Sequence, residues 1–258
     1  MSTAQGPDPL PADAPRERRT PVRVGLVQIN NSFSGQNYLP YSVALLQTYV
    51  QKMAADPGLY EFLPPLYKRV RIADAVESLK DADLVGFSTY VWNGRISLEI
   101  ARRLKALRPG IVIVFGGPHV PDQPEAFLRA NPQIDLAVHN EGERTFLKLL
   151  ESFLDRDAWQ SLPGVSMVRA DGGFVRNPNI DRVRDLDEIP SPFLEGAFDS
   201  IMAANHCIRA ADRSGRSFDV GSCVGKLHVD LKRRNLRSAV DLDLHLVRVD
   251  ADVPAHDG

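Results

Sequence analysis

Cysteine is scarce in this chain: its 258 residues include only Cys207 and Cys223. Two cysteines cannot form the disulfide framework of a small secreted protein, and they cannot supply the three or more thiolates of an iron–sulfur site. No apolar run approaches the ~20 residues that span a bilayer, and the N-terminus lacks the apolar core of a signal peptide. We therefore expect a soluble, cytoplasmic protein with no membrane partner.

An excess of charge of one sign is also missing. Lys and Arg together number 31 and Asp and Glu 33, which gives a formal net charge of −2 at pH 7. Because no broad basic surface is implied, nucleic acid is a poor candidate for a partner. The composition, 43% hydrophobic and 25% charged, is typical of a globular protein that buries a sizeable core.

Composition divides the chain into four segments. Residues 1–20 hold four prolines and almost no large apolar residue, so we expect a disordered tail there. Residues 21–158 alternate apolar strands with amphipathic helices, and residues 159–205 contain a hairpin and a connector. Residues 206–258 contain no Glu, Gln, Thr, Tyr or Trp. This abrupt shift predicts an irregular C-terminal tail and suggests a truncated or frame-shifted gene product.

Five apolar runs, each followed by helical spacing, indicate the fold class. We expect strands at 22–29, 59–66, 84–90, 111–115 and 134–138, and helices at 40–55, 72–79, 93–108, 123–130 and 146–153. Five strand–helix units predict an α/β fold with a doubly wound (flavodoxin- or Rossmann-like), parallel five-stranded sheet. The segments 164–169 and 174–176 around an Asp-Gly-Gly turn predict a β-hairpin after that sheet. In such folds ligands bind at the carboxyl ends of the strands.

Four loops that follow predicted strands carry the residues of a candidate site. They offer many hydrogen-bonding groups, and their paired glycines let a bulky ligand approach the backbone because no Cβ stands in the way. The candidate residues are Asn30, Gly35, Gln36, Asn37 and Tyr38 in the first loop, Ser88, Thr89 and Tyr90 in the second, Gly116, Gly117, Pro118 and His119 in the third, and Glu141, Gly142 and Glu143 in the fourth.

Each loop also has an ordinary structural interpretation. A glycine pair often only makes a turn, and Glu141 and Glu143 suit the first turn of a helix because acidic groups interact favourably with the helix dipole. His119 has no evident partner and fits a surface loop. The sequence has no Gly-x-Gly-x-x-Gly fingerprint, Walker A motif, Gly-x-Ser-x-Gly elbow or His-Glu-x-x-His helix. Residue chemistry alone therefore leaves the ligand open.

Five stretches carry a resemblance to a known family. They are NYLPYSVALLQTYV (37–50), VGFSTYVWN (85–93), VFGGPHV (114–120), HNEGERTFLKLL (139–150) and DLDEIPSPFLEG (185–196). In this order and spacing the chain, over about residues 22–205, resembles the cobalamin (vitamin B12)-binding domain that precedes radical SAM catalytic domains. The resemblance implies cobalamin as the cofactor and partner.

The resemblance also implies roles for the loop residues. Ser88 and Thr89 would belong to a motif along the cofactor's nucleotide tail, and Gly116 and Gly117 to a glycine pair that accommodates the tail or the corrin edge. Residues 141–143 would line the rim, and the loop 30–38 would lie near the lower face of the corrin. The Asp-x-His-x-x-Gly motif that supplies a cobalt-ligating histidine in the mutases is absent. We therefore expect no histidine ligand to the cobalt, which would have water or no lower ligand, and no metal-ligating residues elsewhere.

The family's catalytic half begins with Cys-x-x-x-Cys-x-x-Cys, which holds a 4Fe–4S cluster that binds S-adenosylmethionine. This motif is absent after Asn205. The resemblance thus implies a cobalamin-binding domain that is not catalytic alone, with the cluster and S-adenosylmethionine confined to full-length relatives that perform methyl transfer or rearrangement. A radical SAM domain in trans is a further candidate partner. The alternatives are a flavodoxin-like regulatory module with a non-corrin ligand or protein partner, and a product that residues 206–258 keep from folding.

Overall fold

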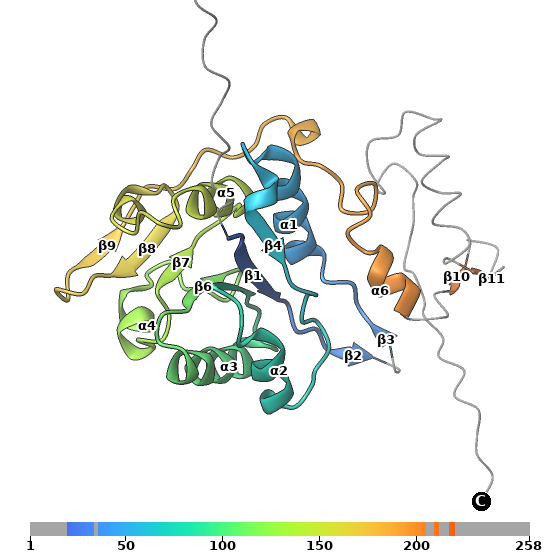
Figure 1. Cartoon of the computed structure of the whole chain (residues 1–258), viewed down its shortest axis with the longest axis horizontal. Helices are drawn as coiled ribbons and strands as arrows, with labels where there is room; N and C mark the ends of the chain where they lie inside the picture. The colour runs from blue at the N-terminus through green and yellow to red at the C-terminus, as the bar shows by residue number, and fades with distance from the viewer. Residues whose placement is uncertain (1–19, 34–35, 205–208, 212–216, 220–258) are drawn as a thin grey trace, which may run out of the picture.

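A seven-stranded sheet is the centre of the computed structural model, which describes residues 20–33, 36–204, 209–211 and 217–219 (Figure 1). The strand order is β4 (Tyr60–Phe62), β1 (Val22–Val27), β5 (Leu84–Ser88), β6 (Val112–Gly116), β7 (Leu136–Val138), β8 (Val165–Val168) and β9 (Phe174–Arg176). Adjacent strands run parallel from β4 to β7. Strand β8 runs antiparallel to β7, and β9 runs antiparallel to β8.

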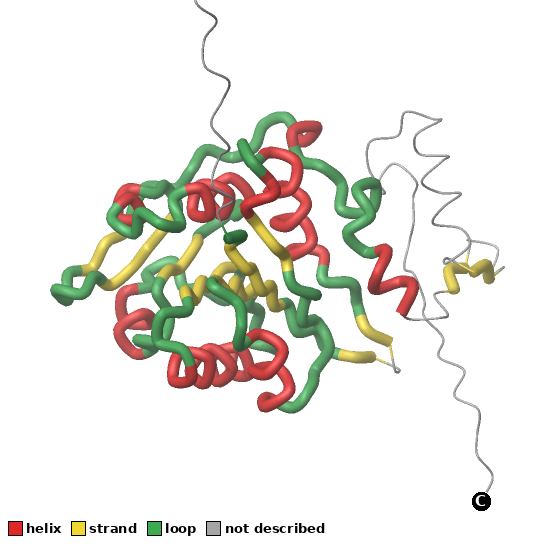
Figure 2. The backbone as a smooth tube through the Cα atoms, in the orientation of Figure 1, coloured by secondary structure: helices red, strands yellow, loops and turns green. Residues whose placement is uncertain are grey.

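Helices cover both faces of this sheet. One face carries α1 (Tyr41–Met53) and α5 (Glu143–Glu151), which also contact each other. The other carries α2 (Ile72–Leu79), α3 (Gly94–Leu107) and α4 (Glu125–Ala130). Figures 1 and 2 show the two helical layers on opposite sides of the strands. Crossovers between parallel strands are right-handed, so the helices change faces where the chain, having moved from β1 to β4, turns back to β5.

Strand β6 shows why the central runs are continuously apolar. Ile113 and Phe115 pack in the core under α2 and α3, whereas Val112 and Val114 pack in the core under α1 and α5. Successive side chains of a strand point to opposite faces, and both faces here are covered by helices. Every position of the strand therefore requires an apolar residue.

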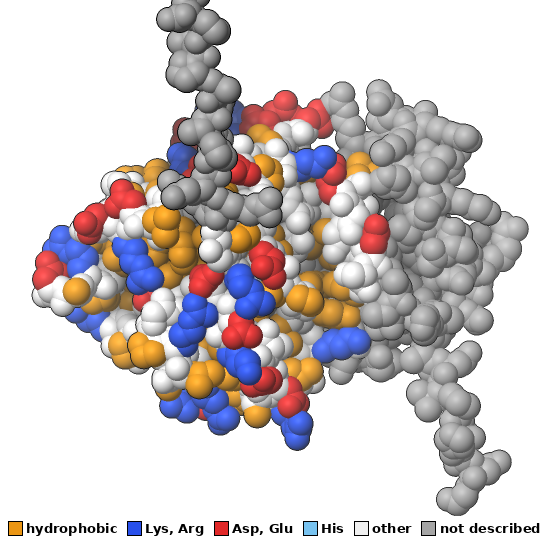
Figure 3. Space-filling model, in the orientation of Figure 1, with side chains coloured by type: hydrophobic (Ala, Val, Ile, Leu, Met, Phe, Trp, Pro, Cys, Tyr) orange, Lys and Arg blue, Asp and Glu red, His pale blue; other side chains and the backbone are white. Residues whose placement is uncertain are grey.

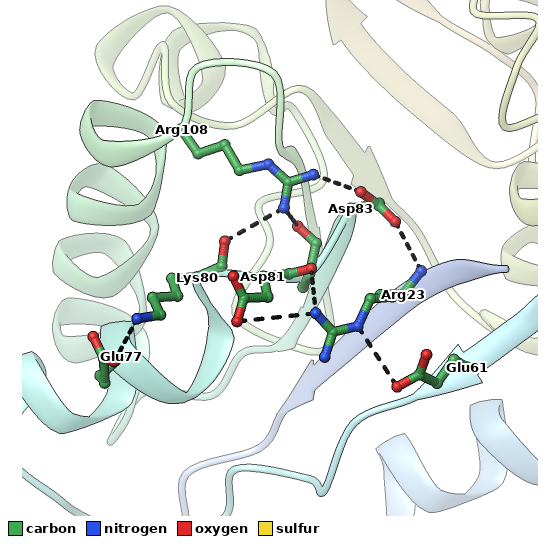
Figure 4. Close-up of polar contacts among 8 residues, drawn as sticks. Arg23, Glu61, Glu77, Lys80, Asp81, Asp83 and Arg108 are labelled. Carbon is green, nitrogen blue, oxygen red and sulfur yellow. Dashed lines mark hydrogen bonds and ion pairs between the residues drawn. The ribbon is translucent and has the colours of Figure 1, made fainter. Parts of the chain in front are cut away.

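An ion-pair network ties the amino ends of the strands together (Figure 4). Asp83 accepts a hydrogen bond from the Arg23 backbone N–H (2.9 Å) and another from Arg108 Nη2 (2.5 Å). Arg108 also donates to the Ala82 carbonyl (2.8 Å), and Arg23 lies 3.6 Å from Glu61. These contacts join β1, β4, β5 and the end of α3 at one edge of the sheet. The opposite, carboxyl edge carries the candidate site.

The predicted α/β fold class is confirmed, with two differences in the sheet. The hairpin extends the sheet from five strands to seven, because β8 pairs with β7 through Ala137–Ser166 and Val138–Val165. The strand predicted at 59–66 is regular only over Tyr60–Phe62. Pro64 and Pro65 follow it, and proline has no N–H with which to continue a ladder.

The connector is irregular but firmly packed. It contains the short helix α6 (Asp199–Ala204), and Phe198 just before this helix is fully buried. Phe198 packs with Ala44 of α1 and with Tyr67, and its ring centroid lies 4.8 Å from that of Phe193. The predicted connector is thus packed against the body of the protein.

The predicted terminal tails fall almost entirely outside the described residues. Residue 20 is described from the first tail, and from 206–258 only β10 (Arg209–Ala211) and β11 (Ser217–Asp219), which pair antiparallel. The proposed division into domains therefore stays a prediction. No described helix is long and apolar enough to cross a membrane. On the face in Figure 3, acidic and basic side chains are interspersed, in agreement with the small net charge.

Candidate functional site

The strand order creates a switch point at the carboxyl edge of the sheet. β1 lies between β4 and β5, so the chain leaves β1 through α1 toward one side and returns through α2 to the other. Loops that diverge in this way leave a crevice beyond the strand ends, where ligands bind in doubly wound folds. The predicted loops after β1, β5, β6 and β7 all lie at this edge.

A cavity of about 380 Å³ opens at this edge, between the sheet and helices α1 and α5. Its apolar lining comes from the sheet (Gly86, Phe87, Val114, Val138) and from the two helices (Val43, Leu46, Phe146). Its remaining lining is Ser42, Ser88, Tyr90, Gly116, Gly117, Pro118, Asn140, Glu141, Gly142, Glu143 and Arg182. The cavity thus has apolar walls and a polar rim, as small-molecule sites commonly do.

Glycines keep the cavity wall and its loops close together. A Cβ on Gly86, in the middle of β5, would lie 3.1 Å from a Leu26 methyl and 3.5 Å from the Phe146 ring. Gly117 has φ +92°, and a Cβ there would lie 2.7 Å from the Thr89 carbonyl oxygen. The Gly116 carbonyl accepts hydrogen bonds from the N–H (2.8 Å) and the hydroxyl (2.7 Å) of Thr89. The glycine-pair loop is therefore in direct backbone contact with the loop after β5.

Asn93 joins the end of β5 to the loop that follows β1. Its side chain is completely buried, and its Nδ2 donates to the carbonyls of Ile29 and Ser88, both at 3.0 Å. Its Oδ1 accepts the Tyr90 N–H at 2.7 Å. The Tyr90 hydroxyl in turn shares a 2.9 Å hydrogen bond with Ser42 of α1. One amide thus fixes the two strand ends that flank the switch point.

Glu143 lines the cavity with a carboxyl group that is only partly hydrogen-bonded. Its Oε2 is buried and has no hydrogen-bond partner among the described residues. Burial raises the pKa of this carboxyl, and the charge of Glu141 raises it further, while the Glu143 N–H opposes the shift. Glu141 itself is engaged, since its Oε2 accepts the Val183 N–H at 2.8 Å. Burial, and then the charge of Glu143, raises the pKa of Tyr41 nearby.

The structure brings eight of the fifteen candidate residues to the cavity: Ser88, Tyr90, Gly116, Gly117, Pro118, Glu141, Gly142 and Glu143. Thr89 lies behind the wall and holds the glycine loop. The four described candidate residues of the first loop do not line the cavity. Asn30 is buried and donates to the Tyr38 carbonyl (3.1 Å), whereas the Tyr38 ring is half exposed. Gln36 and Asn37 form β3 (Gln36–Asn37), which pairs with β2 (Ser32–Phe33), and Gly35 lies outside the described residues.

The two histidines near the strand ends lie away from the cavity lining. The exposed His119 places its ring against Gly94, where a Cβ would lie 2.6 Å from the ring. His139 is buried and its Nε2 shares a 3.0 Å hydrogen bond with the Ser166 hydroxyl. Burial, followed by the charge of Arg176, lowers the pKa of His139. No group of three or more His, Cys, Asp or Glu in the described part of the chain could hold a metal ion.

Sequence reasoning missed several lining residues. Arg182 belongs to the connector and Ser42 to α1, and no local pattern indicates that either reaches this edge. Two other lining residues, Asn140 and Gly86, are of a type that could have indicated a special position in the sequence. Asn140 has φ 60°, a conformation that asparagine tolerates better than most residues. Gly86 interrupts an apolar strand, which commonly marks a close approach of another group.

Comparison with known proteins identifies the domain. The sequence model of the B12 binding domain family matches residues 27–150, a range that begins at the last residue of β1 and extends through most of α5. Residues 27–150 are a B12 binding domain. The strand-end loops predicted as the candidate site all lie within this range.

Relatives of this B12 binding domain include two methyltransferases. The cobalamin-dependent radical SAM methyltransferase TokK of Streptomyces tokunonensis is 34% identical over 167 residues, which is 64% of this chain and 24% of that protein. The 2-(S-pantetheinyl)-carbapenam-3-carboxylate methyltransferase of Streptantibioticus cattleyicolor is 36% identical over 167 residues, again 64% of this chain and 24% of that protein. The chain thus matches about a quarter of the length of these relatives.

A solved structure shares the fold. The cobalamin-dependent S-adenosylmethionine radical enzyme OxsB, with aqua-cobalamin and S-adenosylmethionine bound, superposes with a TM-score of 0.56 at 21% identity. The match covers 70% of this chain and 26% of OxsB. It supports the Rossmann-like architecture of the B12 binding domain.

Proposed function

We propose that this B12 binding domain binds cobalamin, with the nucleotide tail of the cofactor in the cavity between the sheet and helices α1 and α5. The observation that carries the proposal is this cavity itself. It holds about 380 Å³, opens at the switch-point edge, and has a strand glycine, Gly86, in its wall. The tail ends in a flat aromatic base, which fits between apolar walls where no side chain projects.

The residues present fit the cofactor. Phe146 and Leu46 offer apolar surface to the base, and the Ser88 hydroxyl lies at the rim. Gly117 is exposed, and a Cβ there would collide with the Thr89 backbone. Because this position requires glycine, the exposed loop has only backbone at this point. We propose that this loop accommodates the tail or the corrin edge, and that the loop 30–38 lies near the lower face of the corrin. Bound cobalamin supplies a cobalt centre that can carry a methyl group.

We propose that no protein side chain ligates the cobalt. His139 is hydrogen-bonded to Ser166 and the His119 ring lies against Gly94, and neither lines the cavity. A base held in the cavity is also separated from the cobalt. The bound cofactor should therefore show the absorbance spectrum of base-off cobalamin.

Catalysis by a radical SAM mechanism requires groups beyond this B12 binding domain. The two cysteines in the sequence, Cys207 and Cys223, are fewer than the three thiolates of a 4Fe–4S cluster that binds S-adenosylmethionine. We propose that this chain binds the cofactor without catalysing the reaction alone. Methyl transfer or rearrangement would then need a radical SAM domain, which is also where a substrate would bind.

A titration with hydroxocobalamin tests the proposal. The purified chain should bind the cofactor stoichiometrically, followed by absorbance and by co-elution on gel filtration. Gly116→Val should abolish binding, because a Cβ at Gly116 has room, its nearest neighbour lying at 3.7 Å, and a larger side chain would fill the cavity. Gly110→Val is the matched control, since Gly110 precedes the same strand at its other end with no atom within 4 Å of its Cβ position.

The two variants separate the outcomes. Loss of binding in Gly116→Val with retention in Gly110→Val supports the cavity as the cofactor site. Equal binding by both variants would place cobalamin elsewhere. Absence of binding by the folded wild-type chain would refute the proposal and favour a module with a non-corrin ligand.

A further inference from the structure

One oxygen of Glu143 stands out among the polar atoms of the cavity. Glu143 is the first residue of α5 and lines the cavity, and its Oε2 is buried without a hydrogen-bond partner in the described residues. Burying an unpaired polar atom costs about 1–3 kcal/mol, and more for a charged group. Native proteins leave few such groups, and those that remain often serve a function.

Neighbouring groups do not satisfy this oxygen. The Glu141 carboxylate accepts the Val183 N–H, and its charge has the same sign as that of Glu143. The Ser42 hydroxyl is paired with Tyr90, and Arg144 forms an ion pair with Glu188 of the connector. Glu143 therefore offers the cavity a carboxyl group whose Oε2 has no partner among the described residues.

We propose that Glu143 determines which lower base the domain accepts, by sharing one proton with the ring nitrogen of a benzimidazole base. This inference rests on the proposed binding of cobalamin. A base that lies in the cavity cannot ligate the cobalt, so its ring nitrogen keeps a free lone pair. That lone pair is buried and needs a donor, which a carboxyl group can supply.

The electrostatics of the site agree with this assignment. Burial and the neighbouring Glu141 raise the pKa of Glu143, so the carboxyl retains its proton more readily than an exposed one. A protonated carboxyl donates to an unprotonated ring nitrogen, and an ionised one accepts from a protonated ring. In both cases a single hydrogen bond satisfies the two buried atoms that would otherwise lack partners.

Three corrinoids isolate this contact. Cobalamin carries the benzimidazole base, p-cresolyl cobamide carries a phenolic base without a ring nitrogen, and cobinamide lacks the nucleotide. Wild-type protein should bind cobalamin at least ~10-fold more tightly than p-cresolyl cobamide, since about 1.4 kcal/mol corresponds to tenfold in affinity. Glu143→Ala should weaken cobalamin binding by about tenfold while leaving p-cresolyl cobamide and cobinamide unchanged.

Two further variants sharpen the test. Glu143→Gln should retain cobalamin affinity within about threefold, because the Gln amide can still donate to the ring nitrogen. Glu125→Ala is the matched control: Glu125 is the first residue of α4 on the other face of the sheet and does not line the cavity. It should leave the affinity for all three corrinoids unchanged. Circular dichroism establishes that each variant is folded.

Several results would overturn the inference. Equal weakening of cobalamin and p-cresolyl cobamide by Glu143→Ala would mean that Glu143 acts only on the cavity structure. Equal binding of cobalamin and p-cresolyl cobamide by the wild type would show that the domain does not select the base. This wild-type comparison tests the inference even if Glu143→Ala fails to fold. If the folded wild type binds neither cobalamin nor cobinamide, the proposed function itself is refuted.

Discussion

Replacement of Asn93 by alanine should loosen the carboxyl edge of the sheet more than any other single amide substitution at the site. The Asn93 side chain makes three buried hydrogen bonds, to the carbonyls of Ile29 and Ser88 at 3.0 Å each and to the Tyr90 N–H at 2.7 Å. These bonds connect the end of β1 to the end of β5. Asn93 has no exposed surface, so solvent cannot readily replace them.

The magnitude follows from the groups that are left behind. Each of the three backbone partners loses a hydrogen bond at a buried position, at about 1–1.5 kcal/mol apiece. Truncation also leaves a small cavity. We expect Asn93→Ala to lower the free energy of unfolding by about 3–5 kcal/mol, which is a large part of the ~5–15 kcal/mol of a typical domain. Cobalamin binding should weaken as well, because the loop with Ser88 and Tyr90 loses its anchor.

Urea denaturation followed by circular dichroism measures the effect, with Ser97→Ala as the control. Ser97 lies on the same helix, α3, is also completely buried, and has a hydroxyl without a hydrogen-bond partner in the described residues. Its replacement should be neutral or slightly stabilising. A loss below about 1 kcal/mol in Asn93→Ala, or equal losses in both variants, would refute the reasoning that hydrogen bonds of this amide hold the edge together.

Three other predictions concern the same edge. Gly117→Ala should destabilise the protein by about 2–4 kcal/mol, because Gly117 has a φ of +92° and the Thr89 backbone lies 2.7 Å from its Cβ position. Gly116→Ala, the control, should keep a melting temperature near that of the wild type. Similar melting temperatures for the two variants would contradict the prediction. Glu143→Gln should be more stable than the wild type to urea at pH 7, and the difference should vanish as the pH falls toward 4. The raised pKa of Glu143 means that ionisation costs more in the folded state, a cost that is lost once the carboxyl is protonated; a difference independent of pH would rule out this cause. His119→Ala should leave the absorbance spectrum of bound cobalamin unchanged, and a spectral shift would identify His119 as a cobalt ligand.

The fold was largely predictable because its signals are local. The run at 111–115 can be read as a strand covered on both faces, and the structure places Ile113 and Phe115 in one core and Val112 and Val114 in the other. Helix spacing likewise placed α3 and α5 within a few residues of their bounds. The place of the hairpin was not predictable in the same way, since pairing of β8 with β7 depends on which sheet edge is free.

The candidate site was only partly predictable for the same reason. Ser88, Gly116 and Glu143 could be proposed because polar or glycine residues directly follow apolar strands, and parallel strand ends meet at one edge. Asn30 of the first loop does not line the cavity, because its side chain bonds to its own loop, at the Tyr38 carbonyl. The loop was included because it follows a strand, but the direction in which a loop turns is decided by its packing.

The sequence by itself determined the α/β class, the strand ends as the ligand side and the resemblance to a B12 binding domain, because these depend on periodicity and on short motifs. Tertiary structure alone decided that Arg182 of the connector reaches the cavity, that Asn93 joins two strand ends, and that one Glu143 oxygen is buried without a partner. Contacts of this kind join residues that are far apart in the chain or depend on the depth of burial. Neither a contact between distant residues nor the depth of burial can be read from a local pattern of residues, so only the packed structure shows them.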